Sequence, residues 1–398
     1  MRLGIWTVLL KAIHSSTDIV ITAAKRTTIG KFGGSLSTYT SAQLATVLCQ
    51  DLTQSCGLDP DAVDQLILGN AISAGEGQNV ARQAQLNAGF KCSGTAMTVN
   101  QVCGSGLKAI RLAQSAILMG DADVVVAGGV ESMSNAPALA KRTGKQSFDV
   151  NTLSDSLFRD GLNDAFYDYP VGRTAENLAQ RFGLTRQEID EYAVISQKRA
   201  AQATQAGWFV KEIAPIAGLE RDESIRPNTS KEALARLEPV YGPSGMVTAG
   251  NASPISDGAS ILVLTTAAKA KELKMKPLAR ICGYAEAGYK PELMGYAPVP
   301  AIKKLLQNHE QNIDDIDLFE VNEAFACQAL VVRQELGISP DRYNISGGAI
   351  ALGHPLGASG ARILTTLIHN LRRLGLRRGV ASLCVGGGQG IAMEIESM

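Results

Sequence analysis

The chain has 398 residues, of which 45% are hydrophobic and 19% are charged, and it contains 40 glycines. This composition is typical of a soluble globular protein, and the length indicates two or three domains. Lysine plus arginine equals aspartate plus glutamate, at 38 each, so the overall charge favours neither a nucleic acid nor a membrane surface as a partner.

The seven cysteines are an odd number without regular spacing, which argues against a disulfide framework. A reducing compartment fits this pattern, and we expect a cytoplasmic protein. The longest apolar runs are far shorter than a membrane span. Residues 1–16 have the character of an added extension, in which the apolar run 3–10 is interrupted by Lys11. A weak transit segment, a surface extension and a start codon placed too far upstream all fit this stretch.

The first part of the chain alternates between strand-like and helix-like patterns. Short apolar runs predict strands, and apolar residues at a spacing of three and four predict helices between them. Such alternation is typical of an α/β fold built from βαβ units. The predicted strands are 18–23, 64–69, 97–99 and 123–127, and the predicted helices are 41–56, 79–88 and 106–119.

From residue 135 to residue 243 the strand pattern fades and the chain becomes polar and mostly helical. The clearest helix is 185–206, with a threonine at its start and a glycine as its stop. We interpret 135–243 as an insertion over the α/β core, where substrate recognition would be built. The α/β pattern resumes at 260–264, so 17–134 and 244–280 together form the first half.

The third part, residues 281–398, repeats the organisation of the first. In each part a glycine-rich turn opens a helix, a strand follows, and a second group of glycines ends the strand. The first unit is 104–129 and the second is 357–388. Two similar halves related by a pseudo-twofold axis would bring the turn at Cys103 and the loops of the second half to one junction.

Cys103 stands between an extended stretch and the helix predicted from residue 106. A cysteine at the start of a helix faces free backbone N–H groups and the positive end of the helix dipole. Both effects favour the thiolate, which is the nucleophilic form of a cysteine. The alternative is a buried packing cysteine, which is the commoner role of a single cysteine.

Three further positions stand at strand ends or glycine-rich turns of the second half. His354 lies between a glycine and a proline and is a candidate base for activating a thiol, although a lone histidine is more often structural. Cys384 ends a predicted strand, and the glycines after it could expose N–H groups for an oxyanion hole or simply form a tight turn. Asn322 follows the strand 318–321 and could cap the next helix. The sequence contains no metal-ligand spacing and no phosphate-binding loop.

Four motifs occur in a fixed order along the chain. They are Asn-Gln-Val-Cys-Gly-Ser-Gly at 100–106, Asn-Glu-Ala-Phe-Ala at 322–326, Gly-His-Pro-Leu-Gly at 353–357 and Cys-Val-Gly-Gly-Gly-Gln-Gly at 384–390. In this combination the chain resembles the thiolase family from residue 18 to residue 396. The resemblance implies a duplicated five-layered α/β/α/β/α fold, with 135–243 as a loop domain for coenzyme A binding and tetramer contacts.

The resemblance also implies a role for each motif. Cys103 is then the nucleophile that takes the acyl group, His354 removes its proton, and Cys384 handles the α-proton of a second acyl-CoA. His354 with a water held by Asn322 forms one oxyanion hole, and the N–H groups of Cys103 and Gly386 form the other. The residues that would contact coenzyme A or the acyl group are Arg226, Leu237, Ala249, Ser253, Phe325 and Val171.

The implied reaction is a reversible Claisen condensation of two acetyl-CoA molecules to acetoacetyl-CoA and coenzyme A, with no tightly bound cofactor. Pro170 and Val171 replace the His-Met pair that is common in acetyl-specific members, which leaves the chain-length preference open. A 3-ketoacyl-CoA thiolase of fatty acid breakdown is therefore the alternative, and a silent acyl-CoA- or lipid-binding protein is a remote one. A ketosynthase would need a second histidine in place of Cys384 and Asn322. By the same resemblance we expect a homo-oligomer: a dimer through the core, or a homotetramer with further contacts through 141–150.

Overall fold

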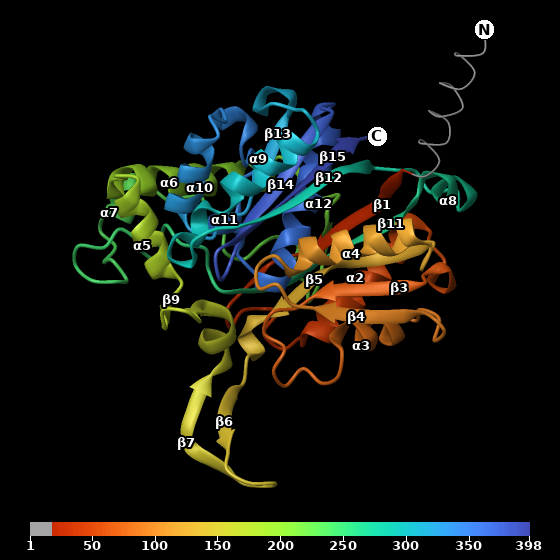
Figure 1. Ribbon diagram of the computed structural model, residues 1–398, viewed down its shortest axis with the longest axis horizontal. Helices are drawn as coiled ribbons and strands as arrows, with labels where there is room; N and C mark the ends of the chain where they lie inside the picture. Colours follow the sequence, from red (N-terminus) through yellow and green to blue (C-terminus); the bar gives the residue numbers. More distant parts are fainter. Residues whose placement is uncertain (1–17) are drawn as a thin grey trace.

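The computed structural model describes residues 18–398, and the expected extension 1–16 lies outside them. The described chain forms two halves, each with its own set of strands, and two helices lie between the two sets (Figure 1). Further helices cover the outer face of each set, so the layers alternate α/β/α/β/α. This arrangement confirms the five-layered fold class predicted from the sequence.

The strands of the first half form a sheet that is covered on both faces. In spatial order they are β1 (Ile19–Thr27), β11 (Ser256–Thr266), β5 (Val124–Ser132), β3 (Gln65–Gly69) and β4 (Thr95–Val99), with the short β10 (Ile213–Ala214) beside β1 and β2 (Gly30–Lys31) beside β11. β3, β4 and β5 are parallel to one another, and β11 is antiparallel to its two neighbours β1 and β5. All nine residues of β5 are buried, as expected for a valine-rich strand in the middle of an α/β sheet.

The strands of the second half continue the same hydrogen-bonded path. In spatial order they are β12 (Ala279–Gly288), β15 (Gln389–Ser397), β14 (Arg378–Val385) and β13 (Leu318–Val321). β12 pairs with β1 where Val20 lies opposite Arg280, so the two sets of strands are joined edge to edge. β13 and β14 are parallel, so their carboxyl ends, near Asn322 and Cys384, point the same way.

The central layer consists of α4 (Ser105–Met119) and α12 (Leu356–Leu374). α4 packs on β3 and β5, whereas α12 packs on strands of both halves. The two helices approach closely because glycines lie in their contact. A Cβ atom at Gly106 would lie 2.7 Å from the carbonyl oxygen of Gly357, and one at Gly360 would lie 2.5 Å from the nitrogen of Leu107. The glycine repeat in the sequence therefore serves helix packing.

The outer layers are also helical. They contain α2 (Ser41–Cys56) and α3 (Val80–Asn87) on the first half, and α9 (Pro298–Asn308) and α10 (Ala326–Glu335) on the second, while the short α8 (Ala267–Glu272) and α11 (Ala349–Leu352) lie in connections. α2 begins at a capping box of Thr40 and Gln43 and ends at Gly57, whose φ is 69°. Within residues 18–398, no helix has both the length and the apolar character that crossing a membrane requires.

Residues 135–243 include a hairpin that projects from the body of the molecule, drawn in yellow in Figure 1. Its strands are β6 (Ala138–Arg142) and β7 (Phe148–Asp155). The sequence did not predict them, because most of their side chains are exposed and no buried face imposes an apolar alternation. The rest of the region is less helical than predicted, because irregular chain fills most of 206–243. It contains a π-helix (Leu157–Leu162), the short β8 (Asn163–Asp164) and β9 (Tyr169–Pro170), and α5 (Gly172–Arg181), α6 (Arg186–Gln205) and α7 (Lys231–Ala235).

Candidate active site

Cys103 lies on a strained turn between β4 and α4. Val102 has a φ of 46°, which is unfavourable for a β-branched residue. Polar side chains hold this turn: Asn100 Oδ1 accepts the N–H of Val102 at 2.8 Å, and Ser105 Oγ donates to the Val102 carbonyl at 2.7 Å. Gly104 leaves no room for a side chain, because a Cβ there would lie 2.6 Å from a side chain of β15. The residues of the motif thus fix the backbone that carries Cys103.

Cys103 is 7% exposed, and burial raises the pKa of its thiol to about 12. The backbone N–H groups of Gly386 and of Cys103 itself lower the pKa, but burial outweighs them. The N–H groups therefore act in the predicted direction, but burial is the larger effect and the thiol is the stable form of the resting site. A base must remove its proton before Cys103 can act as a nucleophile.

Cys384 lies near the end of β14, on the hairpin that β14 forms with β15. The turn contains Gly387 and Gly388, whose φ values of 83° and 79° favour glycine. Cys384 is fully buried, and burial raises the pKa of its thiol far above the ordinary value, with a further contribution from Cys103. A Cβ at Gly104 would lie 2.8 Å from the side chain of Val385, so the turns that carry Cys103 and Cys384 pack against each other although they come from different halves of the chain.

His354 is buried and neutral. Its Nδ1 lies 2.5 Å from Ser359 Oγ. Ser359 donates its own proton to the Pro355 carbonyl at 2.9 Å, so it accepts the proton of Nδ1–H and leaves Nε2 with a free lone pair. Burial, with a smaller effect of Arg362, lowers the pKa of His354 to about 3. The ring is therefore uncharged at neutral pH and can accept a proton at Nε2.

Asn322 follows β13 and is fully buried. It does not cap α10, because that helix begins at Ala326 with Phe325 in the cap position, so the helix-cap alternative is wrong. Its Nδ2 lies 3.4 Å from Nε2 and 3.5 Å from Nδ1 of His354. Its Oδ1 accepts from Arg362 Nη2 at 3.3 Å. The amide therefore turns its donor end toward the histidine.

Glu323 anchors the loop that carries Asn322. Its buried carboxylate accepts hydrogen bonds from Tyr192 at 2.9 Å, Ser196 at 2.6 Å and Asn344 at 3.0 Å. Tyr192 and Ser196 lie on α6, so the carboxylate ties the second half to the 135–243 region. A buried carboxylate needs such partners, and this one has them.

Two of the predicted substrate contacts lie against this loop. Ser253 donates twice to the Ala324 carbonyl, from its N–H at 3.1 Å and from its Oγ at 2.9 Å. Phe325 pairs its backbone with Ala252. The structure therefore brings Ser253 and Phe325 next to the loop of Asn322.

The other predicted substrate contacts lie on surrounding loops. Arg226 and Ala249 are exposed, whereas Leu237 and Val171 are half-buried. Leu237 lies next to the Ala249 loop, since a Cβ at Gly250 would come 2.6 Å from it. Among residues 18–398, no three His, Cys, Asp or Glu side chains gather in a metal-binding arrangement.

Comparison with known proteins places this site in a family. The model of the thiolase N-terminal domain matches residues 19–268, and that of the thiolase C-terminal domain matches residues 275–397. The chain belongs to the thiolase family. It is 46% identical over 391 residues to the acetyl-CoA acetyltransferase of Cupriavidus necator, which covers 96% of this chain and 99% of that protein. It is 48% identical over 389 residues to the acetyl-CoA acetyltransferase of Pseudomonas aeruginosa, covering 95% and 99%.

Solved thiolase structures have the same fold. The acetyl-CoA acetyltransferase of Bacillus anthracis superposes with a TM-score of 0.93 at 42% identity, covering 96% of this chain and all of that chain at 100%. Human mitochondrial 3-ketoacyl-CoA thiolase in complex with CoA superposes with a TM-score of 0.92 at 40% identity, covering 96% and 99%. The family predicted from the four motifs is confirmed, and this thiolase is an enzyme of the acyltransferase class.

Three buried residues of this thiolase site were not predicted from the sequence: Ser359, Arg362 and Glu323. Ser359 and Arg362 are polar residues three positions apart in a helix whose first half is otherwise small and apolar. That spacing places them on one helix face and is a signal that sequence reasoning could have used. Glu323 is part of a motif, but nothing nearby in the sequence indicates which donors would surround it.

Proposed function

We propose that this thiolase is an acetyl-CoA C-acetyltransferase that forms and cleaves acetoacetyl-CoA through an acyl-Cys103 intermediate. The observation that carries the proposal is the packing of two turns that each hold a buried thiol, Cys103 and Cys384, since a Cβ at Gly104 would lie 2.8 Å from the side chain of Val385. A Claisen condensation needs one nucleophile that carries the acyl group and a separate base for the α-proton. The names of the relatives from Cupriavidus necator and Pseudomonas aeruginosa support acetyl as the group transferred.

The first half-reaction loads Cys103. His354 Nε2 takes the Cys103 proton, and the thiolate attacks the thioester carbon of acetyl-CoA. The carbonyl oxygen becomes an oxyanion, which the N–H groups of Cys103 and Gly386 stabilise. The carbon–sulfur bond to coenzyme A then breaks, and the leaving thiolate takes the proton of Cys384. The enzyme now holds acetyl-Cys103, an imidazolium at His354 and a thiolate at Cys384.

The second half-reaction forms the carbon–carbon bond. The Cys384 thiolate removes an α-proton from a second acetyl-CoA; burial raises the pKa of this thiol, so its thiolate is a strong base. Protonated His354 and a water held by Asn322 stabilise the enolate oxygen. The enolate carbon attacks acetyl-Cys103, and Cys103 leaves as a thiolate that recovers its proton from His354. Every group returns to its resting state, and the reverse sequence is thiolysis.

The second candidate is a 3-ketoacyl-CoA thiolase with a longer acyl pocket. It is favoured by Pro170 and Val171, which replace the His-Met pair of acetyl-specific members. The similar structure named human mitochondrial 3-ketoacyl-CoA thiolase is consistent with this candidate.

Coenzyme A-dependent cleavage of acetoacetyl-CoA, measured beside cleavage of 3-ketooctanoyl-CoA, tests both candidates. A strong preference for acetoacetyl-CoA supports the acetyltransferase. Equal or greater activity on the longer substrate supports the 3-ketoacyl-CoA thiolase. A folded protein that cleaves neither substrate would contradict both candidates. The remaining alternative would then be a non-catalytic acyl-CoA- or lipid-binding protein.

We also propose a cytoplasmic homotetramer with contacts through the β6–β7 hairpin and a place in fatty acid metabolism. Three large apolar side chains of the hairpin are exposed, which an assembly would cover: Phe148 at 51%, Val150 at 68% and Leu153 at 60%. The seven cysteines are free thiols, which suits a reducing compartment. Sedimentation equilibrium tests the assembly: a tetramer mass is expected, and Val150→Lys should reduce it to a dimer. A dimer of the unmodified protein would contradict the proposal.

A further inference from the structure

α12 presents two polar side chains to the site from adjacent turns. Ser359 and Arg362 are three positions apart, so they project from one face of the helix. Ser359 Oγ contacts His354 Nδ1 at 2.5 Å, and Arg362 Nη2 contacts Asn322 Oδ1 at 3.3 Å. One face of α12 therefore contacts both His354 and Asn322.

The contact with Arg362 determines which end of the Asn322 amide faces His354. An asparagine amide has an acceptor end and a donor end, whereas a guanidinium can only donate. Arg362 therefore binds Oδ1 and turns Nδ2 toward His354, where it lies 3.4 Å from Nε2. A reversed amide would set two donors against each other at Arg362 and would present an acceptor to the site.

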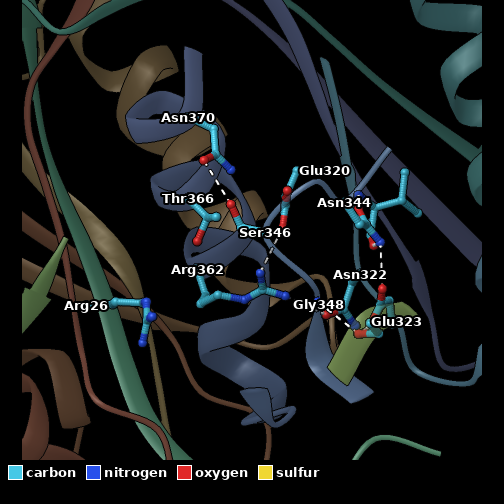
Figure 2. Close-up of polar contacts among 12 residues, drawn as sticks. Arg26, Glu320, Asn322, Glu323, Asn344, Ser346, Gly348, Arg362, Thr366 and Asn370 are labelled. Carbon is cyan, nitrogen blue, oxygen red and sulfur yellow. Dashed lines mark hydrogen bonds and ion pairs between the residues drawn. The ribbon is translucent and has the colours of Figure 1, made fainter. Parts of the chain in front are cut away.

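Glu320 holds Arg362 in this position. Arg362 Nη1 donates to Glu320 Oε1 at 3.1 Å, and the two side chains are only 2% and 3% exposed. Glu320 lies two residues before Asn322, and residues two apart in extended chain point to the same side. The planar guanidinium spans both acceptors, which a lysine ammonium, a single point of charge, does not reproduce. Figure 2 shows Arg362 reaching from its helix toward Glu320.

We infer that Arg362 is a positioning residue that fixes the Asn322 amide with its donor end toward His354, and that carbon–carbon bond formation depends on this orientation while loading of Cys103 does not. The inference rests on the proposed function. Loading uses the N–H groups of Cys103 and Gly386, which belong to other elements of the site. The condensation step uses the donor that Asn322 presents, so only this step depends on the amide direction. Arg362 also lowers the pKa of His354, the base for loading, and Arg362→Lys keeps the positive charge that does so.

A neighbouring residue of α12 provides a matched control. Thr366 is buried and donates to Glu212 Oε1 at 3.1 Å. Glu212 in turn pairs with the buried Arg26 at 2.6 Å. Thr366→Val therefore removes a buried polar contact of the same helix, one turn further along, without touching Asn322.

The test measures two rates for the unmodified enzyme, Arg362→Lys and Thr366→Val. Exchange of labelled coenzyme A into acetyl-CoA reports loading of Cys103 alone, and acetoacetyl-CoA formation reports the full reaction. We expect Arg362→Lys to lose the full reaction by about tenfold or more and to keep exchange within about twofold, because one oriented donor is lost. Thr366→Val should keep both rates. Condensation that survives in Arg362→Lys, or exchange that falls in parallel with it, would overturn the inference.

A double-variant cycle separates action through Asn322 from a general effect on the fold. If Arg362 acts through Asn322, then Asn322→Ala combined with Arg362→Lys should be no slower in condensation than Asn322→Ala alone. Losses that multiply would show that Arg362 acts elsewhere and would overturn the inference.

A second variant keeps the test valid if Arg362→Lys folds poorly. Glu320→Leu with Arg362→Met replaces the buried ion pair by apolar side chains, an exchange that proteins often tolerate without loss of stability. We expect a melting temperature near that of the unmodified enzyme and the same separation of exchange from condensation. An unmodified enzyme that neither exchanges nor condenses would remove the proposed function and this inference together, whereas full condensation in the apolar pair removes the inference alone.

Discussion

Gly386 packs against Val102, although the two residues belong to different halves of the chain, since a Cβ at Gly386 would lie 3.3 Å from the Val102 side chain. The backbone N–H of Gly386 also lowers the pKa of Cys103, the residue after Val102. In the proposed mechanism, one half thus supplies the nucleophile, and the other supplies a donor for the oxyanion. Neither half contains the complete site.

We expect Cys103→Ala to abolish acyl transfer, because the thiol that accepts the acyl group is absent. Folding and coenzyme A binding should survive, which circular dichroism and calorimetric titration with coenzyme A can check. Cys56→Ala is the control, since Cys56 is a half-buried residue on α2, outside the site. Turnover by Cys103→Ala at the unmodified rate would remove the nucleophile assignment.

We expect Cys384→Ala to separate the two half-reactions. Cys103 should still become acetylated, because a coenzyme A thiolate can leave and take its proton from water. Condensation should fall by about a hundredfold or more, the usual contribution of a general base. Mass spectrometry of the intact protein detects the acetyl group, and absorbance follows acetoacetyl-CoA. A variant that condenses normally would show that another group removes the α-proton.

We expect His354 to make the folded protein sensitive to acid. The unfolded chain takes up a proton at this histidine below its ordinary pKa of 6.5, whereas burial keeps the folded site unprotonated until about 3. Stability is therefore full above pH 6.5 and falls as the pH drops through this window, by at most about 1.4 kcal/mol per pH unit.

Urea unfolding of the unmodified protein and of His354→Asn between pH 7 and about pH 4.5 measures this effect. All carboxylates are common to both proteins, so they cancel in the difference. The unmodified protein should lose stability relative to the variant as the pH falls. Two parallel curves would contradict a depressed pKa at His354.

We expect Gly360→Ala to loosen the contact between α4 and α12. The added Cβ would lie 2.5 Å from the backbone nitrogen of Leu107, so the helices must move apart. Overpacking of this kind costs about 1–3 kcal/mol or more in the free energy of unfolding. Gly288→Ala is the control, because no atom lies within 4 Å of its Cβ position. Equal unfolding midpoints for the two variants would mean that α4 and α12 can move apart without a loss of stability.

The features that the sequence predicted well are local ones. The threonine start and glycine stop of α6 and the run of valines in β5 are local signals, and the structure has a helix and a strand there. The two glycine-rich units predicted the duplicated fold, because each of them indicates one turn, one helix and one strand in the same order. The order of the four motifs was sufficient for the family.

The sequence failed where the outcome depends on partners that are distant along the chain. The sequence predicted free N–H groups at Cys103, because a helix starts there. The burial that raises the pKa of its thiol comes from residues of both halves, which the sequence did not reveal. Asn322 was expected as a helix cap or a water-holding residue, and its contact with Arg362 arises only when β13 meets α12. The β6–β7 hairpin lacks a buried face, so it left no apolar alternation to detect.

The sequence by itself therefore determined the family, the layers and the chemical groups available to the site. Only the tertiary structure decided that both site thiols are protonated, which end of an amide faces the histidine and which buried charges hold that amide. The physical reason is that secondary structure follows from neighbours in the chain, whereas desolvation, amide direction and ion pairing depend on neighbours in space.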